Sequence, residues 1–268
     1  MNITIGKPCA ISEKGGRQNN EDAIYPQPEA VKLTQKLFLV CDGVGGAEKG
    51  EIASSLACDY FQWYFLNMPE ENKPTPEFVG KALRYTEIKF DEYTAEHPEA
   101  AGMATTLTML YVGWKGITLA HVGDSRIYQF REGRILYKTE DHSLVNSLLQ
   151  SGRITPEEAR SHPQRNVITR ALQGTKHPSE ADVILLNDVE PGDYFFMCTD
   201  GVLENFTDES LAALFKNKAA SEVIKDTLME TCSEKTRDNF SFYIIPIQNV
   251  QESDSVKQNI LSFFYSFI

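Results

Sequence analysis

The chain has 268 residues, of which 41% are hydrophobic, and a formal net charge of −12. This length can bury the core of one large domain or two small ones. The negative charge disfavours non-specific binding of the whole surface to nucleic acids or anionic lipids. No run approaches the ~18 uncharged apolar residues of a membrane-spanning helix, and residues 1–16 lack a secretory signal pattern. Five scattered cysteines without CxxC spacing argue against a disulfide framework or a zinc site, so we expect a soluble cytoplasmic protein.

The first half of the chain is predicted to hold two strands and two helices. Apolar strands are expected at 3–12 and 36–41. The second strand runs into a glycine-rich turn at 43–50, within the segment FLVCDGVGGAEKGEIAS (38–54). Apolar residues at helical spacing predict a helix after this turn. A second helix is expected from about Thr75, which can cap it ahead of Pro76.

The second half is predicted to be a meander of strands followed by helices and further strands. The β-branched and aromatic run at 105–139 is divided by the turn signals GWKG, GDSR and REGR. Helices are expected at 144–150, 155–162, 208–217 and 221–235, and strands in DYFFMCTDG and NFSFYIIPI. Because helices and antiparallel strands are grouped rather than strictly alternating, we expect an α+β fold with helices on the outer faces of antiparallel sheets.

Carboxylates recur at the boundaries of the predicted strands. Six lie at such positions: Glu21, Asp22, Asp42, Asp124, Asp200 and Asp238. A single aspartate at a strand end is usually a turn or cap residue, but the repetition favours convergence of these side chains. Converging carboxylates repel one another and raise their pKa values unless cations neutralise them. Oxygen ligands without convergent histidine or cysteine favour Mg²⁺ or Mn²⁺ over zinc.

Gly43 directly follows Asp42 in the glycine-rich turn. Because glycine has no Cβ atom, the backbone there can approach a metal ion closely, and the Gly43 carbonyl is a candidate ligand. Two metals bridged by Asp42 could hold and acidify a water molecule, giving a hydroxide at neutral pH for in-line attack on phosphorus. This chemistry would explain why a rigid apolar strand leads to one carboxylate and a glycine.

Seven motifs occur in the order seen in one family of enzymes. They are GRQNNEDAIY, FLVCDGVGGAEKGEIAS, GMATTLTMLYV, LAHVGDSRIYQF, HPQRNVITRALQG, FFMCTDGVLENFTDE and TRDNFSFYII. In these motifs the chain resembles the metal-dependent (type 2C, PPM) protein serine/threonine phosphatases, and most closely their compact bacterial branch. Several ordered motifs over most of the chain are far more specific than any one of them.

The resemblance implies a four-layer α-β-β-α sandwich, in which two central antiparallel sheets are flanked by pairs of helices. It also implies a centre of two Mn²⁺ or Mg²⁺ ions at one end of the sandwich. Mapped by motif, the catalytic aspartates would be Asp42, which bridges the ions, and Asp200 and Asp238, which complete one metal site.

The second metal site would be served by Glu21, Asp22 and the Gly43 carbonyl, some of them through water. Bacterial members often show a third metal, to which Asp124 and Asp200 would contribute. Each of these assignments is implied by the resemblance.

Arg17 occupies the family position that grips the substrate phosphate. A guanidinium fork matches phosphate oxygens bidentately and stabilises the charge on the transferring group. Some eukaryotic members carry a histidine soon after the aspartate–glycine pair, but Val44 and two glycines follow here, so no protein general acid is assigned. A metal-bound water would serve instead.

Residues 143–177 correspond to the flap beside the active site in the family. Loops next to a site commonly set substrate preference. The candidates there for contacts to substrate or to the third metal are Ser161, Arg165 and Arg170.

Residues 1–248 are expected to form the catalytic domain and residues 249–268 a tail with an amphipathic helical pattern. The apolar side chains of that pattern are Val256, Ile260, Phe263, Phe264 and Phe267. We expect the tail to pack on its own domain, because exposed aromatic patches are rare on monomers. Docking to a partner or a membrane surface is the alternative.

The expected function is hydrolysis of phosphoserine and phosphothreonine in proteins by a metal-bridged hydroxide, opposing a cognate bacterial serine/threonine kinase. Two alternatives stay open. One is a non-catalytic regulator that binds phosphoproteins on the same fold, and the other is a phosphomonoesterase for small molecules. The complete set of carboxylates argues against the regulator, and metal-dependent turnover would exclude it.

Overall fold

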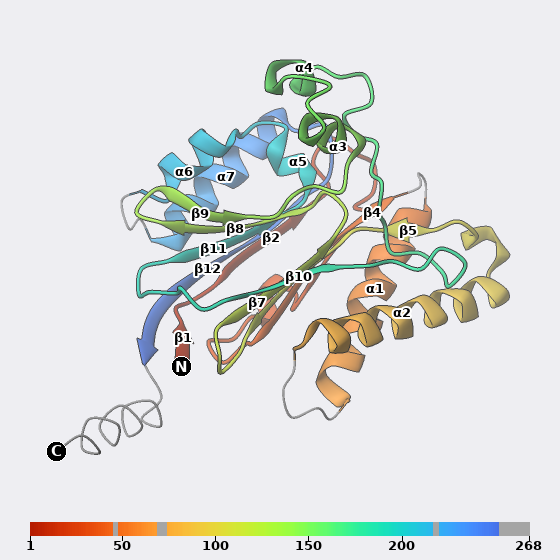
Figure 1. The fold of residues 1–268 in the computed structure, drawn as a ribbon, viewed down its shortest axis with the longest axis horizontal. Coiled ribbons are helices and arrows are strands. Elements are labelled where there is room, and N and C mark those ends of the chain that lie inside the picture. The colour runs from red at the N-terminus through yellow and green to blue at the C-terminus, as the bar shows by residue number, and fades with distance from the viewer. Residues whose placement is uncertain (45–47, 69–73, 217–219, 252–268) are drawn as a thin grey trace.

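The computed structural model of the chain has four layers, with helices outside and two sheets between them (Figure 1). It describes residues 1–44, 48–68, 74–216 and 220–251. The two central sheets are antiparallel throughout their paired strands. This arrangement confirms the predicted α+β sandwich.

The first sheet has β12 near its middle, paired with three other strands. Its path is β1 (Asn2–Ile5), β12 (Phe240–Gln251), β11 (Tyr194–Cys198), β8 (Arg126–Arg131) and β9 (Arg134–Lys138), with β2 (Cys9–Glu13) also paired to β12. The predicted strand at 3–12 is divided here, because Gly6 and Pro8 interrupt it and Pro8 has no N–H for the ladder. Residues 252–268, which include most of the predicted tail, lie outside the described residues.

The second sheet contains the strand that carries Asp42 and Gly43. Its path is β10 (Asp182–Leu186), β7 (Ile117–Val122), β6 (Leu107–Val112), β4 (Leu37–Val44) and β3 (Asp22–Tyr25), with β5 (Ala104–Thr105) paired to β4. Strand β10 is absent from the sequence predictions. It carries four apolar residues in a row at 183–186, but the run is short, and a short apolar run does not by itself distinguish a strand from other structure.

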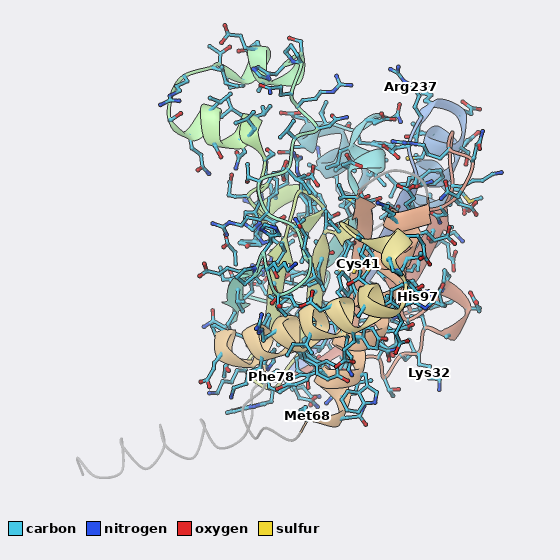
Figure 2. All side chains as sticks on the ribbon, turned by 90° about the vertical axis from the view of Figure 1, so that its right-hand side faces the viewer. Lys32, Cys41, Met68, Phe78, His97 and Arg237 are labelled. Atoms are coloured by element: carbon cyan, nitrogen blue, oxygen red, sulfur yellow. The ribbon has the colours of Figure 1, made fainter. Side chains whose placement is uncertain are left out.

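Helix pairs cover both outer faces of the sandwich. Figure 1 shows α1 and α2 against the second sheet and α6 and α7 against the first. The bounds are α1 (Glu48–Asn67), α2 (Pro76–Glu96), α6 (Asp208–Leu214) and α7 (Ser221–Lys235). Thr75 caps α2 by accepting a hydrogen bond from Phe78 N, as predicted. In Figure 2, α2 crosses the front of the molecule between Phe78 and His97, with Cys41 behind it.

Shorter helices connect the main elements. They are η1 (Pro28–Ala30), η2 (Pro98–Ala100), α3 (Leu144–Gln150), α4 (Pro156–Arg160) and α5 (Asp200–Leu203). No helix of the described residues combines the length and the apolar character that a membrane span requires.

Three clusters of buried side chains fill the three spaces between the four layers. Phe38 and Tyr243 meet between the sheets, with ring centroids 5.2 Å apart. Phe61 packs between the second sheet and its helices, and Phe196 and Leu228 pack on the other side. Burial of each such side chain contributes about 1.5–3 kcal/mol to folding, so the sandwich gives its strand ends a rigid base.

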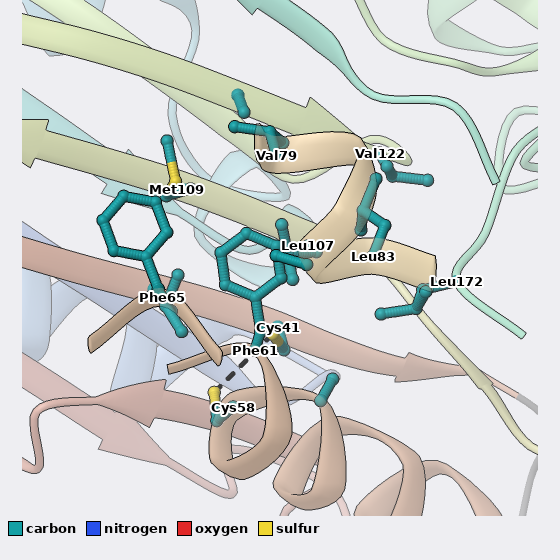
Figure 3. Close-up of a cluster of buried hydrophobic side chains, with 14 of the residues drawn as sticks. Cys41, Cys58, Phe61, Phe65, Val79, Leu83, Leu107, Met109, Val122 and Leu172 are labelled. Carbon is teal, nitrogen blue, oxygen red and sulfur yellow. Dashed lines mark hydrogen bonds between the residues drawn. The ribbon is translucent and has the colours of Figure 1, made fainter. Parts of the chain in front are cut away.

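Strand β4 is buried on both faces, and its alternation fixes the direction of Asp42. Leu39 and Cys41 face the helices, where the Cys58 thiol donates to the Cys41 sulfur at 3.6 Å (Figure 3). Val40 faces the other sheet. Because side chains alternate along a strand, Asp42 follows Val40 to the inter-sheet side. The strand therefore places the Asp42 carboxylate at one end of the space between the sheets.

Candidate active site

Two neighbouring strands bring the first pair of aspartates together. Asp22 in β3 pairs directly with Asp42 in β4. Ile24, two residues after Asp22, belongs to the cluster between the sheets, so Asp22 also faces that space. Like charges directly opposite each other in an antiparallel pair destabilise it. The pairing therefore calls for a neutralising partner.

The first sheet contributes the facing half of the site. The Thr199 hydroxyl, just after β11, donates to Oδ2 of Asp22 at 2.9 Å, and it accepts from Ser241 N of β12 at 3.0 Å. Asp200 follows Thr199 as the first residue of α5, and Asp238 lies shortly before β12. The aspartates of the two sheets thus meet at one end of the sandwich.

Burial and mutual repulsion raise the pKa values of four carboxyl groups, those of Asp22, Asp42, Asp124 and Asp200. Burial is the largest cause at each. The pKa of Asp22 rises to about 8, that of Asp124 to about 7 and that of Asp200 to about 6. The pKa of Asp42 rises well above its usual range through burial and then through the charges of the other four aspartates, first Asp22 and then Asp200. A hydrogen bond with Asp42 partly lowers the pKa of Asp200.

Asp22 supplies a specific observation that fits a bound cation. Its Oδ1 atom is the single buried side-chain polar atom without a hydrogen-bond partner among the described residues. A cavity of about 410 Å³ opens beside it, lined also by Asn20 and Glu51. A buried, unpartnered polar atom costs free energy, and a divalent cation would remove that cost. The available donors are oxygens, which suit Mg²⁺ or Mn²⁺.

Gly43 and Gly50 allow a close approach of backbone and carboxylate. A Cβ atom at Gly43 would lie 2.1 Å from the Gly50 carbonyl oxygen. A Cβ atom at Gly50 would lie 2.8 Å from Oε2 of Glu21 and 2.9 Å from the Gly43 carbonyl oxygen. The Glu21 side chain and the Gly43 carbonyl therefore meet beside Gly50 on α1. Burial raises the pKa of Glu21.

Arg17 reaches the cluster from the loop before β3. Its Nη2 atom donates to Oδ2 of Asp238 at 2.7 Å. The Arg17 side chain is 55% exposed and that of Asp238 27%, so both border solvent where a substrate could arrive. Figure 2 places the neighbouring Arg237 at the upper end of the molecule, away from the Phe78 end of α2.

Asn239 fixes the loop that carries Arg17 and Glu21. Its amide donates to the carbonyls of Lys14 at 2.9 Å and Asn19 at 2.8 Å, and its Oδ1 accepts from Glu21 N at 2.9 Å. Asn239 is buried. No local sequence pattern reveals this role, because the partners of Asn239 lie more than 200 positions earlier in the chain.

Asp124 approaches the cluster from the turn between β7 and β8. Gly123 has φ of +104°, and a Cβ atom there would lie 2.6 Å from Cγ2 of Thr106. The Thr106 hydroxyl accepts from Asp42 N at 2.9 Å and contacts the Ser125 hydroxyl at 2.8 Å. Thr106 therefore connects the backbone of Asp42 to the turn that carries Asp124.

The flap candidates lie outside this cluster. Ser161 ends α4 and is exposed, and the described contacts include no hydrogen bond between it and the aspartates. Arg170 donates to Oδ1 of Asp182 at 2.9 Å, and Arg165 is exposed. In Figure 1, α4 stands beyond the ends of the strands. The six carboxylates and Arg17 are thus brought together, while Ser161 is not.

His121, His142 and Asp182 form a second group whose ligand atoms lie within 4.8 Å of one another. The two imidazole rings stack, with centroids 4.5 Å apart and planes inclined by 17°. Stacked rings direct their in-plane lone pairs along nearly parallel lines rather than toward one point. His142 Nδ1 accepts from Gly123 N, and Arg170 neutralises Asp182. This geometry supports packing and hydrogen bonding rather than metal ligation.

The carboxylate and carbonyl oxygens at this end of the α-β-β-α sandwich could hold divalent cations, which activate water in many hydrolases. A family model described as Protein phosphatase 2C matches residues 13–239, and the chain belongs to this family. The family and enzyme class predicted from the sequence motifs are thereby confirmed.

Two curated relatives are similar in sequence. The serine/threonine protein phosphatase PstP of Mycobacterium tuberculosis is 34% identical over 207 residues, which are 76% of this chain and 37% of PstP. The matched region thus spans little more than a third of that protein. The protein phosphatase PhpP of Streptococcus pneumoniae is 35% identical over 193 residues, which are 69% of this chain and 74% of PhpP.

Solved structures share the fold. The crystal structure of M. tuberculosis PstP/Ppp superposes with a TM-score of 0.79 at 30% identity, over 92% of this chain and 100% of that one. A structure of the PstP catalytic domain in complex with two manganese ions gives a TM-score of 0.76 at 27% identity, over 92% and 100%. The ligand roles of individual residues in this chain remain predictions.

Proposed function

We propose that this chain is a metal-dependent protein phosphatase that hydrolyses phosphoserine and phosphothreonine. The observation that carries the proposal is the convergence of Asp22, Asp42 and Asp200 from both sheets, with raised pKa values and an unpartnered buried oxygen on Asp22. Repulsion between these carboxylates destabilises the cluster, and bound cations would remove that repulsion. Such perturbed pKa values are typical of functional sites.

The residues of the chain would divide the work as follows. Asp42 would be shared by two Mn²⁺ or Mg²⁺ ions, Asp200 and Asp238 would complete one site, and Asp124 would serve a third ion. Glu21, Asp22 and the Gly43 carbonyl would complete the second site. When bound, such ions supply an activated water and offset negative charge on a phosphate group.

Arg17 would orient the phosphate group. Its guanidinium already reaches the edge of the cluster and can present two parallel N–H donors to phosphate oxygens. Asn239 would position Arg17 and Glu21 through its hydrogen bonds to the loop that carries them. Thr199 would hold Asp22 in a fixed orientation.

The substrates would be phosphoproteins, and a serine/threonine kinase would be the functional opposite of this enzyme. The names of PstP and PhpP support this substrate class. The five cysteines are free, which supports a reducing compartment such as the cytoplasm. We place the catalytic domain at residues 1–248 with the tail after it, although β12 continues through Gln251.

The test is phosphate release from a phosphoserine peptide during a Mn²⁺ titration. We expect activity that appears with Mn²⁺, is lost with a chelator, and falls by at least about a thousandfold in Asp42→Asn and Asp200→Asn, as for removal of central catalytic groups. Asp226→Asn is the matched control, since Asp226 is 72% exposed on α7.

The competing functions give different results. Binding of phosphopeptide without turnover in folded, Mn²⁺-loaded protein would identify a non-catalytic regulator. Faster hydrolysis of small phosphate esters than of phosphopeptides would identify a phosphomonoesterase. Either result would overturn the proposed function.

A further inference from the structure

A second cavity, of about 300 Å³, lies at the C-terminal end of α2. Phe90 and Asp91 of α2 form one wall, Met103 forms another, and Gln173 and Gly174 form a third. It is separate from the cavity beside Asp22, with which it shares no lining residue. In Figure 2 this end of α2 is marked by His97.

Two carboxylates of α2 hold the wall made by the end of the flap. Asp91 Oδ2 accepts from both N and Oγ1 of Thr175. One turn earlier, Glu87 Oε1 accepts from N of Ser179 at 2.6 Å and from its hydroxyl at 2.8 Å. A Cβ atom at Gly174 would lie 2.1 Å from Asp91 Oδ1, so this contact is close. The cavity is therefore preformed, which lowers the entropic cost of filling it.

Backbone hydrogen bonds connect the cavity to the aspartate cluster. Thr105 pairs with Leu172 through two backbone hydrogen bonds of 3.0 and 2.8 Å. The Thr105 hydroxyl donates to the carbonyl oxygen of Asp42 at 2.8 Å. Met103 and Gln173, which line the cavity, therefore lie next to a bridge that touches the Asp42 backbone.

The cavity also lies within reach of a peptide bound at the cluster. Thr105 pairs with Gly43, and Met103 lies two residues before Thr105 in the chain. For an extended segment with a rise of about 3.3 Å per residue and a strand spacing of about 4.8 Å, the Cα atoms of Met103 and Gly43 would lie about 8 Å apart. An extended peptide covers about 8 Å in two to three residues, and the length of the phosphorylated side chain and the depth of the cavity add one or two more, which gives about three to five.

The chemistry of the cavity sets what it can accept. Its floor contains the buried side chains of Phe90 and Met103. Its rim carries Lys176 and His177, which are exposed and make no ion pair within the described part of the chain. An apolar side chain would bury surface on the floor, and an acidic neighbour would lie near the Lys176 ammonium.

We propose that this cavity is a substrate subsite. It receives an apolar side chain of the phosphoprotein, three to five residues from the phosphorylated residue, next to an acidic residue that faces Lys176 and His177. The proposal rests on the proposed phosphatase function. It concerns the residues that flank the phosphorylated residue, which the aspartate cluster does not contact.

Ala101→Trp tests the subsite by filling it from its exposed rim. Ala101 lines the cavity outside the main helices and strands, and the contacts of the described residues include none between it and the aspartate cluster. Two phosphoserine peptides are compared, one with leucine and glutamate at the flanking positions and one with alanine at both. We expect the wild-type protein to prefer the first by about tenfold in kcat/KM, and Ala101→Trp to lose that preference. Lys176→Ala should lose part of it.

The control substrate is a small aryl phosphate, which cannot reach the cavity. Its hydrolysis should change less than about twofold in Ala101→Trp and Lys176→Ala. Ala213→Trp, at an exposed position on α6, is the matched control and should keep the peptide preference. Equal kcat/KM values for the two peptides in the wild-type protein, or an equal loss of aryl phosphate activity in Ala101→Trp, would overturn the subsite.

A binding measurement separates failure of the subsite from failure of the proposed function. If no variant hydrolyses the aryl phosphate, the phosphatase function fails. Even then, fluorescence anisotropy of the two labelled peptides with Mn²⁺-loaded protein measures whether the cavity distinguishes between them. Tighter binding of the leucine–glutamate peptide, lost in Ala101→Trp, supports it, and equal binding of the two peptides contradicts it.

Discussion

Arg17 and Asp238 form an ion pair of 2.7 Å at the edge of the aspartate cluster. The contact joins the residue proposed to bind phosphate to a residue proposed to bind metal. Because both side chains are partly exposed, the pair contributes little to the free energy of folding. We therefore expect Arg17 to exchange this partner for a phosphate group at small cost once a cation binds Asp238.

Arg17→Ala should lower kcat/KM for a phosphoserine peptide by about a hundredfold, because a donor to the developing charge is lost. Arg17→Lys should recover part of this, since it keeps the charge without the planar fork. The affinity for Mn²⁺ should not fall in either variant, because Arg17 supplies no ligand. Arg134→Ala, whose side chain is 72% exposed on β9, is the control. Unchanged peptide kinetics in Arg17→Ala would remove it from the site.

Asn239→Ala should free the loop that carries Arg17 and Glu21. Loss of its three hydrogen bonds should cost about 1–3 kcal/mol in the free energy of unfolding. Since the loop also positions catalytic groups, kcat should fall while the aspartates remain in place. Hydrogen exchange of residues 14–20, measured with denaturant unfolding and kinetics, checks this.

Asn146→Ala is the matched control for Asn239→Ala, because it removes one amide hydrogen bond to Asp141 O in the flap. It should leave exchange in residues 14–20 unchanged. If Asn239→Ala loses stability but keeps full kcat and normal exchange in residues 14–20, Asn239 stabilises the fold without positioning the loop, and the prediction is wrong.

Gly50→Ala and Gly80→Ala form a matched pair of substitutions within helices. At Gly80 a Cβ atom would meet nothing within 4 Å, so alanine should stabilise α2 by about 1 kcal/mol. At Gly50 the methyl group would press against Glu21 Oε2 and the Gly43 carbonyl. We expect Gly50→Ala to lower Mn²⁺ affinity by about tenfold or more, and Gly80→Ala to leave it unchanged. Titration calorimetry compares them, and equal affinities would contradict the second metal site.

The raised pKa values predict how the metal-free chain responds to pH. The pKa of Asp22 rises from 3.8 to about 8 on folding, so between these values the folded chain holds a proton that the unfolded chain has released. The free energy of unfolding without metal should therefore fall as pH rises through this window. Asp200 and Asp124, with pKa values of about 6 and 7, act in the same direction.

Cations should reverse this loss of stability, since they bind the ionised carboxylates. Mn²⁺ should raise Tm more near pH 8 than near pH 5. Asp22→Asn should flatten the pH dependence of the chelated protein and raise its Tm near pH 8, while weakening Mn²⁺ binding. Thermal unfolding with chelator and with Mn²⁺ measures both effects. A chelated wild-type protein that gains stability with rising pH would contradict the raised pKa of Asp22.

Local patterns predicted most of the fold. The helix at 221–235 and the one at 144–150 have the observed bounds, because apolar spacing, and at the second helix the Ser143 cap, are local signals. The division of β1 from β2 follows from Gly6 and Pro8 between them, since Pro8 has no N–H for the ladder. Strand β10 was missed although residues 183–186 are all apolar, because so short a run is ambiguous and only its pairing with β7 identifies it as a strand.

The candidate site was predictable to the extent that strand ends identify it. Asp42 and Asp200 follow apolar strands in the sequence, and family motifs indicated Arg17. Thr199 and Asn239 were missed, because their roles depend on partners from the opposite end of the chain. The register that pairs Asp22 with Asp42 is likewise a property of the assembled sheet.

The central claim is that the aspartate cluster is a divalent-metal centre. Its most direct test is anomalous diffraction from crystals of the full chain grown with Mn²⁺. We predict two manganese peaks that share Asp42, with Asp200 and Asp238 at one and the Gly43 carbonyl at the other, and loss of both peaks in Asp42→Asn. Ordered aspartates without manganese between them, in protein that hydrolyses phosphopeptide under the same conditions, would contradict the claim.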